Sequence, residues 1–99
     1  MNKNLLRQAQ QLQARLQQAQ AELERMTIEG SAGGGAVKVV MTGKQMVESV
    51  VITPEAAEDV EMLQDLIVAA VNDASKKVQD ITTKKLSTLT GGMKLPGMA

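Results

Sequence analysis

Apolar residues along the first quarter of the chain recur at alternating intervals of four and three positions. The series is Leu5, Ala9, Leu12, Leu16, Ala19, Leu23 and Met26. This spacing is the a/d repeat of a coiled-coil seam, sustained over about three heptads without glycine or proline. A helix from about residue 4 to residue 25 would be roughly 33 Å long. A compact domain of this size has a radius of gyration of only about 13 Å, so we expect the helix to protrude from it.

The pattern changes to a period of two after Met26, which indicates β-strands. A short β-compatible stretch, TIEGSA, is followed by three consecutive glycines, which predict a turn. The next stretch, AVKVVMT, alternates Val37, Val39 and Met41 against more polar positions. After a turn at Gly43-Lys44, MVESVVIT would place Met46, Val50 and Ile52 on one face, with Glu48 interrupting. Short turns favour an antiparallel three-stranded meander, whose apolar face needs a helix to cover it.

A second long helix is predicted after the strands. Thr53 followed by Pro54 is typical of a helix start, and Asp59 is a second possible cap. From Val60 the apolar positions form one stripe, and the helix is expected to end near residues 87–90. The remaining stretch, rich in glycine with one proline, predicts a flexible tail over 91–99 behind a single domain of residues 1–90.

The expected fold is therefore α+β, with the order α-β-β-β-α, a three-stranded antiparallel sheet and two long helices. Both helices are too long for the sheet to cover, and a symmetric homodimer is the simplest way to bury the remaining stripes. The sequence leaves open whether the seams pair within one chain or between two. The residues expected on them are Leu5, Leu12, Leu16, Leu23, Ile67, Val71 and Val78.

The composition removes several chemistries from consideration. The chain has no aromatic residue, no cysteine and no histidine, so it lacks thiolate ligands and the commonest general base and metal ligand. We expect no enzyme, no cofactor, no metal site and no small-molecule substrate. No apolar run is long enough for a membrane span and no signal peptide is visible, so we expect no membrane partner and a cytoplasmic protein. The seven methionines either fill the core, which we favour for Met26, Met41, Met46 and Met62, or form an adaptable surface.

Charge is balanced in total but segregated along the chain. Eleven basic residues match eleven acidic ones. Residues 1–25 hold four basic and two acidic residues, residues 54–75 hold six acids and no base, and residues 76–99 hold five lysines and one acid. The acids near the start of the second helix and the lysines near its end both favour the helix dipole. Segregation still permits a local basic surface.

Several stretches resemble one protein family. They are RQAQQLQ, EGSAGGGAVKVVMTG, VVITPE, DVEMLQDLIVAAVNDASKKV and GGMKLPGM, which together span nearly the whole chain. They are similar to the YbaB/EbfC family of bacterial nucleoid-associated proteins, and the EMLQDLIVAAVNDA stretch is the most specific of them. The resemblance implies a small cytoplasmic homodimer with tweezer-like helical arms, and binding to double-stranded DNA at the nucleoid.

Without aromatic residues to stack on bases, DNA binding would depend on phosphate contacts by arginine and lysine. The candidates are Lys3, Arg7, Arg15, Lys76, Lys77, Lys84 and Lys85. The acidic segment 54–75 should then face away from the duplex. The alternative function is a protein–protein interaction or scaffolding module that uses the coiled-coil-like seams and a Met-rich surface.

Overall fold

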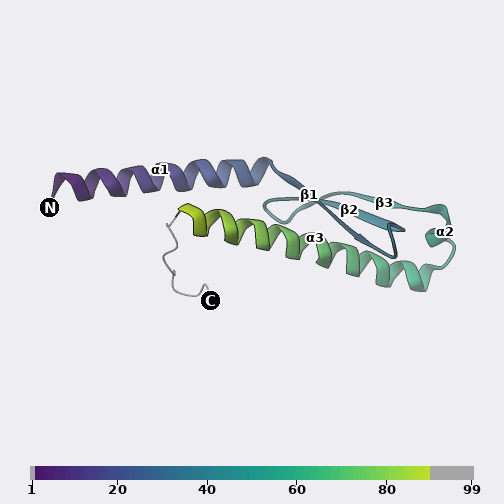
Figure 1. Cartoon of the computed structure of the whole chain (residues 1–99). Coiled ribbons are helices and arrows are strands. Elements are labelled where there is room, and N and C mark those ends of the chain that lie inside the picture. Colours follow the sequence, from purple (N-terminus) through teal and green to yellow (C-terminus); the bar gives the residue numbers. More distant parts are fainter. Residues whose placement is uncertain (1, 90–99) are drawn as a thin grey trace.

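The first helix forms as predicted and is closed at both ends by hydrogen bonds. The computed structural model describes residues 2–89, and within them α1 spans Lys3–Arg25 (Figure 1). Asn2 caps its start, because the Asn2 side chain accepts a hydrogen bond of 2.9 Å from the backbone N–H of Asn4. The helix ends where Met26 turns extended, and the Met26 N–H still donates to the carbonyl of Glu22. The tail expected over residues 91–99 lies outside the described range.

Three strands follow in the predicted antiparallel order. They are β1 (Thr27–Ala32), β2 (Val37–Thr42) and β3 (Val47–Ile52), with β2 in the middle of the sheet. The glycine turn lies between β1 and β2, and its three glycines all have positive φ, which explains why glycine is used there. Between β2 and β3, Val40 pairs with Ser49 whereas Met41 pairs with Val47, so Glu48 is an extra residue that interrupts the register.

The second helical region consists of two helices instead of one. A short helix, α2 (Pro54–Ala57), is capped by Thr53, and the long helix α3 (Val60–Leu89) begins after Asp59. Both predicted caps form: the Thr53 hydroxyl accepts from the N–H of Ala56 at 3.3 Å, and the Asp59 carboxylate accepts from the N–H of Met62 at 3.1 Å. The fold is therefore α-β-β-β-α as expected, with the added turn of α2.

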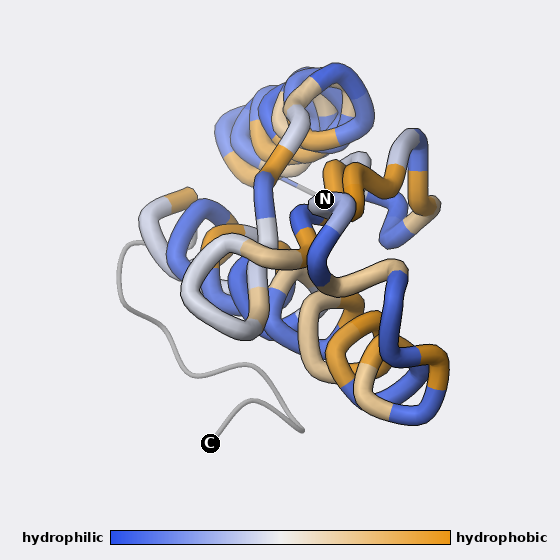
Figure 2. The backbone as a smooth tube through the Cα atoms, turned by 90° about the vertical axis from the view of Figure 1, so that its right-hand side faces the viewer, coloured by the Kyte–Doolittle hydropathy of each residue, from blue (hydrophilic) through white to orange (hydrophobic). Residues whose placement is uncertain are grey.

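The core lies between α3 and the inner strands. Its buried members are Val37, Val39 and Met41 on β2 and Ala70, Ala74 and Val78 on α3. Small residues on α3 let the helix lie very close to β1 at Gly30, where a Cβ would be only 2.4 Å from the backbone nitrogen of Ala74. Hydrophobic and hydrophilic segments alternate along both long helices in Figure 2, as expected for helices with a single buried face.

The prediction that four methionines fill the core is correct for only half of them. Met41 is buried and Met26 packs against the core, but Met46 is 65% exposed and Met62 is 45% exposed. The prediction that Met46 shares a strand face with Val50 was also wrong. Met46 precedes β3, in the turn that joins it to β2, so the alternation along the sequence does not place its side chain.

The third strand has little cover. Val50 pairs with the buried Val39 and so lies on the helix side of the sheet, yet it remains 42% exposed. Val51, on the opposite side of the sheet, is 61% exposed. The reason is that α3 packs on β1 and β2, leaving β3 as an open edge with apolar side chains on both faces.

The molecule is strongly elongated, as the helix lengths predicted. It measures 66 × 25 × 15 Å with a radius of gyration of 18.5 Å, against about 13 Å for a compact domain of this size. Figure 1 shows α1 continuing well past the end of α3. Residues 3–15 are all exposed, and we call them the α1 arm. Within the described residues, neither long helix contains a stretch apolar enough to cross a membrane.

Candidate nucleic-acid interface

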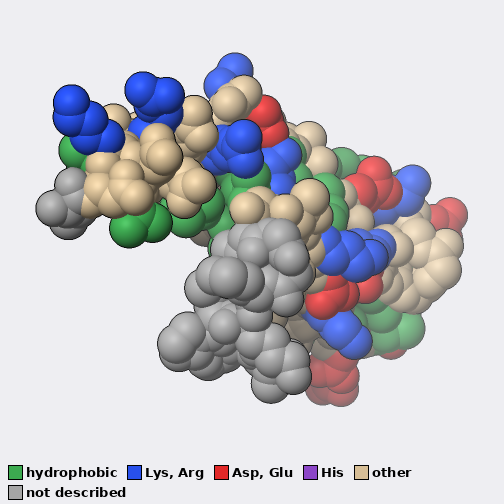
Figure 3. Space-filling model, turned by 60° about the vertical axis from the view of Figure 1, so that its left-hand side comes forward, with side chains coloured by type: hydrophobic (Ala, Val, Ile, Leu, Met, Phe, Trp, Pro, Cys, Tyr) green, Lys and Arg blue, Asp and Glu red, His purple; other side chains and the backbone are tan. Residues whose placement is uncertain are grey.

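The α1 arm carries three exposed basic side chains. At about 100° of rotation per residue, Lys3 and Arg7 lie opposite the apolar stripe and Arg15 flanks it. Figure 3 shows Lys and Arg side chains along one edge of the arm and apolar side chains along another. None of the three forms an ion pair with any residue between 2 and 89. The arm therefore presents positive charge that no carboxylate in this part of the chain neutralises.

The four lysines on α3 fall into two pairs. Lys76 and Lys84 are exposed and form no ion pair with another described residue. Lys77, in contrast, lies 3.0 Å from the Asp73 carboxylate and donates to the carbonyl of Glu29 at 3.3 Å. Lys85 forms an ion pair with Glu22 on α1. The seven candidates thus include two that already have a carboxylate partner and five cations that have none among residues 2–89.

Asp73 connects α3 to the edge of the sheet. Its carboxylate accepts a hydrogen bond of 3.0 Å from the backbone N–H of Ser31 on β1. That hydrogen bond, followed by the one from Lys77, holds the pKa of Asp73 below its usual value. Asp73 therefore stays charged at neutral pH, and Lys77 is engaged in holding β1 against the helix.

Glu22 and Lys85 connect the two long helices. The pKa of Glu22 lies below its usual value, chiefly because of the hydrogen bond from Lys85 and the positive charge of that lysine. Beside this pair lies a groove of about 320 Å³, lined by Arg15, Gln18, Ala19, Glu22, Lys85, Thr88 and Leu89. The contact brings together residues 63 positions apart in the sequence.

The seam residues divide according to where α1 meets α3. Leu23 is buried at the base of α1 and Val78 lies in the core, so both pack within the single chain. Leu16, Ile67 and Val71 are half-buried, whereas Leu5 is 60% exposed and Leu12 is 41% exposed. Within residues 2–89, the heptad stripe is thus buried only at its C-terminal end.

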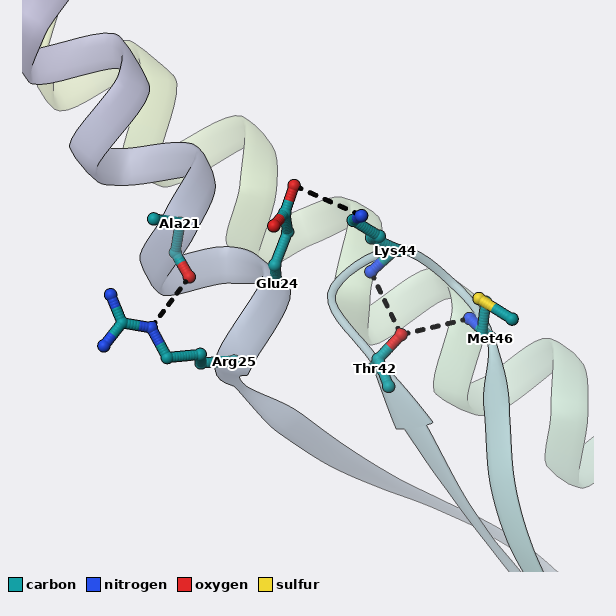
Figure 4. Close-up of polar contacts among 6 residues, drawn as sticks. All are labelled: Ala21, Glu24, Arg25, Thr42, Lys44 and Met46. Atoms are coloured by element: carbon teal, nitrogen blue, oxygen red, sulfur yellow. Dashed lines mark hydrogen bonds and ion pairs between the residues drawn. The ribbon is translucent and has the colours of Figure 1, made fainter.

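An ion pair fastens the turn between β2 and β3 to the base of α1, and hydrogen bonds hold the turn itself in shape (Figure 4). The Thr42 hydroxyl accepts from the backbone N–H groups of Lys44 and Met46, at 3.2 and 3.3 Å. The Lys44 ammonium then lies 3.4 Å from the Glu24 carboxylate on α1. Sequence reasoning missed the partners of both Glu22 and Glu24, because each pairs with a residue far away in the chain.

The acidic residues gather at the other end of the molecule. Five exposed carboxylates lie on α2, on the start of α3 or on the link between them: Glu55, Glu58, Asp59, Glu61 and Asp65. Figure 1 places these elements at the end opposite the tip of α1. Among the described residues, no three carboxylates come together in a way that could hold a metal ion. The long axis of the molecule therefore separates a basic arm from an acidic end.

Comparison with known proteins gives one consistent result. The profile of the YbaB/EbfC DNA-binding family matches residues 1–93. A nucleoid-associated protein of Pelotomaculum thermopropionicum is 49% identical over 96 residues, covering 95% of this chain and 91% of that protein. One from Desulforamulus reducens is 48% identical over 100 residues, covering 99% and 94%. The crystal structure of an uncharacterized protein from Helicobacter pylori superposes with a TM-score of 0.79 at 22% identity, covering 92% of this chain and 99% of that one.

Proposed function

The chain belongs to the YbaB/EbfC DNA-binding family, and from that premise we propose that it is a bacterial nucleoid-associated protein of the cytoplasm. It binds duplex DNA as a homodimer and performs no catalysis. The observation that carries this proposal is the α1 arm, which holds Lys3, Arg7 and Arg15 in solvent, far from the acidic end. A chain without net charge can bind a polyanion in this way, because screening limits the repulsion from distant carboxylates to about 10 Å at 0.1 M salt.

The proposed contacts are to phosphates. The chain has no aromatic side chain for stacking on bases, and long basic side chains on a rigid helix can reach the DNA backbone without reading its sequence. Lys3, Arg7 and Arg15 supply these contacts on α1, and Lys76 and Lys84 supply them on α3. Lys77 and Lys85 contribute only after giving up the carboxylates that hold them.

The homodimer is supported by the apolar surface that one chain leaves uncovered. Edge strands with exposed apolar side chains are usually covered in native proteins, and β3 exposes Val50 and Val51 on its two faces. Apolar surface that a partner could bury also remains on the two long helices. It belongs to Leu5 and Leu12 on the arm and to the half-buried Leu16, Ile67 and Val71. Leu23 and Val78 would support the same assembly indirectly, by fixing the helices within each chain.

Solution mass tests the homodimer. We expect the protein at about 10 μM to sediment at twice the chain mass of 10.6 kDa. We place the dimer contact at the open edge strand β3, so Val51→Lys should shift the protein to the monomer, because each chain would bring a charged side chain to the contact and lose apolar burial. The control is Gln64→Lys, which adds the same charge at an exposed position of α3. A wild-type protein that sediments as a monomer at this concentration would refute the homodimer.

A salt titration with duplex DNA tests the function. Fluorescence anisotropy of a labelled duplex of arbitrary sequence should show binding that weakens steeply between about 0.05 and 0.2 M KCl. The double variant Lys3→Gln/Arg7→Gln should bind at least tenfold more weakly at about 0.1 M KCl, with a smaller salt slope, since each lost phosphate contact removes about 0.9 from that slope.

The matched control removes the same charge from β2 and from the turn after it, with Lys38→Gln/Lys44→Gln. We expect it to change affinity less than threefold, as judged by screening between separated charges. Equal losses in the two double variants would contradict the assignment to the arm. Absence of binding even at low salt would instead favour the interaction module, with its exposed seams and the exposed Met46 and Met62 as the surface.

A further inference from the structure

The groove between α1 and the end of α3 has the donors that an anion needs. It lies where the two helices come together, and its polar lining residues include Arg15, Gln18 and Lys85. Arginine offers a planar fork that matches the oxygens of a phosphate, and lysine adds a mobile point charge. The Thr88 hydroxyl also lines the groove, but its hydrogen is donated to the carbonyl of Lys84 at 2.9 Å.

One acidic side chain lies among these donors. Glu22 lines the same groove and forms an ion pair with Lys85, while Arg15 forms no ion pair within residues 2–89. The Glu22 carboxylate neutralises the positive charge of Lys85, which a phosphate oxygen could neutralise in its place. The Glu22 side chain is about half exposed, at 46%, so a competing anion can reach the pair from solvent.

We propose that this groove is a binding site for one phosphate of the DNA backbone, and that Glu22 competes with the phosphate for Lys85. The inference rests on the proposed function and adds to it a particular site and an internal competitor. Arg15 and Gln18 would receive the phosphate, and Lys85 would transfer from the Glu22 carboxylate to a phosphate oxygen. Glu22 then weakens binding to DNA, although it also ties α1 to α3.

The direction in which Glu22→Gln changes the affinity for DNA separates this role from a purely structural one. If the ion pair serves only to hold the arm on α3, then Glu22→Gln loosens the arm and weakens DNA binding. If Glu22 competes with phosphate, the same substitution frees Lys85 for the duplex and strengthens binding. One added phosphate contact steepens the salt slope by about 0.9, which corresponds to roughly eightfold tighter binding at 0.1 M salt relative to 1 M.

The experiment compares Glu22→Gln with Glu24→Gln on a labelled duplex across a KCl series. Glu24 is a suitable control, because it lies on the same helix, pairs with Lys44 outside the groove and loses the same charge. We expect Glu22→Gln to tighten binding roughly five- to tenfold at about 0.1 M KCl, and Glu24→Gln to change it less than twofold. Adding Arg15→Gln to Glu22→Gln should abolish the gain.

A second variant shows whether the result depends on the amide group that glutamine introduces at position 22. Glu22→Ala removes the carboxylate without adding a new hydrogen-bonding group, and it should also tighten binding. Equal effects of Glu22→Gln and Glu24→Gln, or weaker binding by both Glu22 variants, would overturn the phosphate groove while leaving DNA binding itself intact. If neither the wild type nor any variant bound the duplex at low salt, the proposed function would fail together with the groove.

Discussion

Replacing Gly30 by alanine is expected to lower the free energy of unfolding by about 3 kcal/mol, at the upper end of the range for overpacked cores. The added Cβ would lie 2.4 Å from the backbone nitrogen of Ala74, 2.5 Å from the carbonyl oxygen of Ala70 and 2.7 Å from the Ala74 Cβ. None of these atoms can move by changing a rotamer. Relief requires α3 to move away from β1, which opens the contact between the helix and the core strands.

Backbone freedom does not explain the glycine at this position. The φ of Gly30 is not among the positive values, so alanine could adopt the same conformation, and it would even gain about 0.4–1 kcal/mol from a less flexible unfolded chain. The expected loss therefore comes from the clash alone. Urea denaturation followed by far-UV circular dichroism measures it, since the chain has no aromatic residue to report by fluorescence.

The neighbouring Ser31→Ala is the matched control for Gly30→Ala. Ser31 is exposed, and its backbone N–H, which bonds to Asp73, survives the substitution. We expect a change within about 0.5 kcal/mol, as for most surface substitutions. Similar midpoints for Gly30→Ala and the wild type would mean that α3 does not lie as close to β1 as the structure places it.

Local patterns were sufficient to predict the long helices and the three strands, but not the separate short helix α2. The heptad repeat gave α1, the alternation of Val37, Val39 and Met41 gave the buried face of β2, and the glycine run gave the turn before it. These features depend on residues within a few positions of one another, where periodicity and capping act directly. The break at Asp59 was also present in the sequence, since this residue is an N-cap of ordinary type.

Contacts between distant segments could not be predicted in this way. Nothing in TIEGSA indicates that Gly30 touches α3, and nothing around Glu22 indicates Lys85 as its partner. The exposure of Met46 was missed for another reason: Met46 lies in the turn before β3, where the alternation of a strand does not place a side chain. The candidate basic residues could be identified from the sequence, but which of them are held by carboxylates could not.

Gly43→Ala should release α1 from the body of the protein without unfolding the rest. The added Cβ would lie 1.7 Å from the carbonyl oxygen of Leu23 and 2.5 Å from its carbonyl carbon, so the base of α1 cannot keep its position. The helix is held there by few contacts, chiefly the buried Ala19 and Leu23 and the ion pairs of Glu22 and Glu24. Detaching it costs about 2–3 kcal/mol, mostly for exposing one leucine, and this cost limits the effect of the clash.

Amide hydrogen exchange would show whether the loss is confined to α1. Exchange should accelerate throughout α1 in Gly43→Ala, because a helix without tertiary contacts is only marginally stable in water, while β2 and the centre of α3 stay protected. Gly34→Ala is the control. Gly34 has a φ of +66° and nothing within 4 Å of the position of an added Cβ, so alanine there would meet no clash. We expect this variant to lose about 1–2 kcal/mol of stability from backbone strain alone.

The same Gly43 variant tests whether DNA binding depends only on the charge of the basic residues or also on their arrangement on the two helices. Removing charges cannot separate these two contributions. Detachment removes no basic side chain from the α1 arm but moves Arg15 away from Lys85, so the groove between the helices no longer exists. If the helices must be held together to bind the duplex, affinity should fall several-fold at constant net charge. Unchanged affinity, with α1 shown to be detached by exchange, would mean that the basic residues act as independent charges and that their arrangement on the two helices contributes nothing.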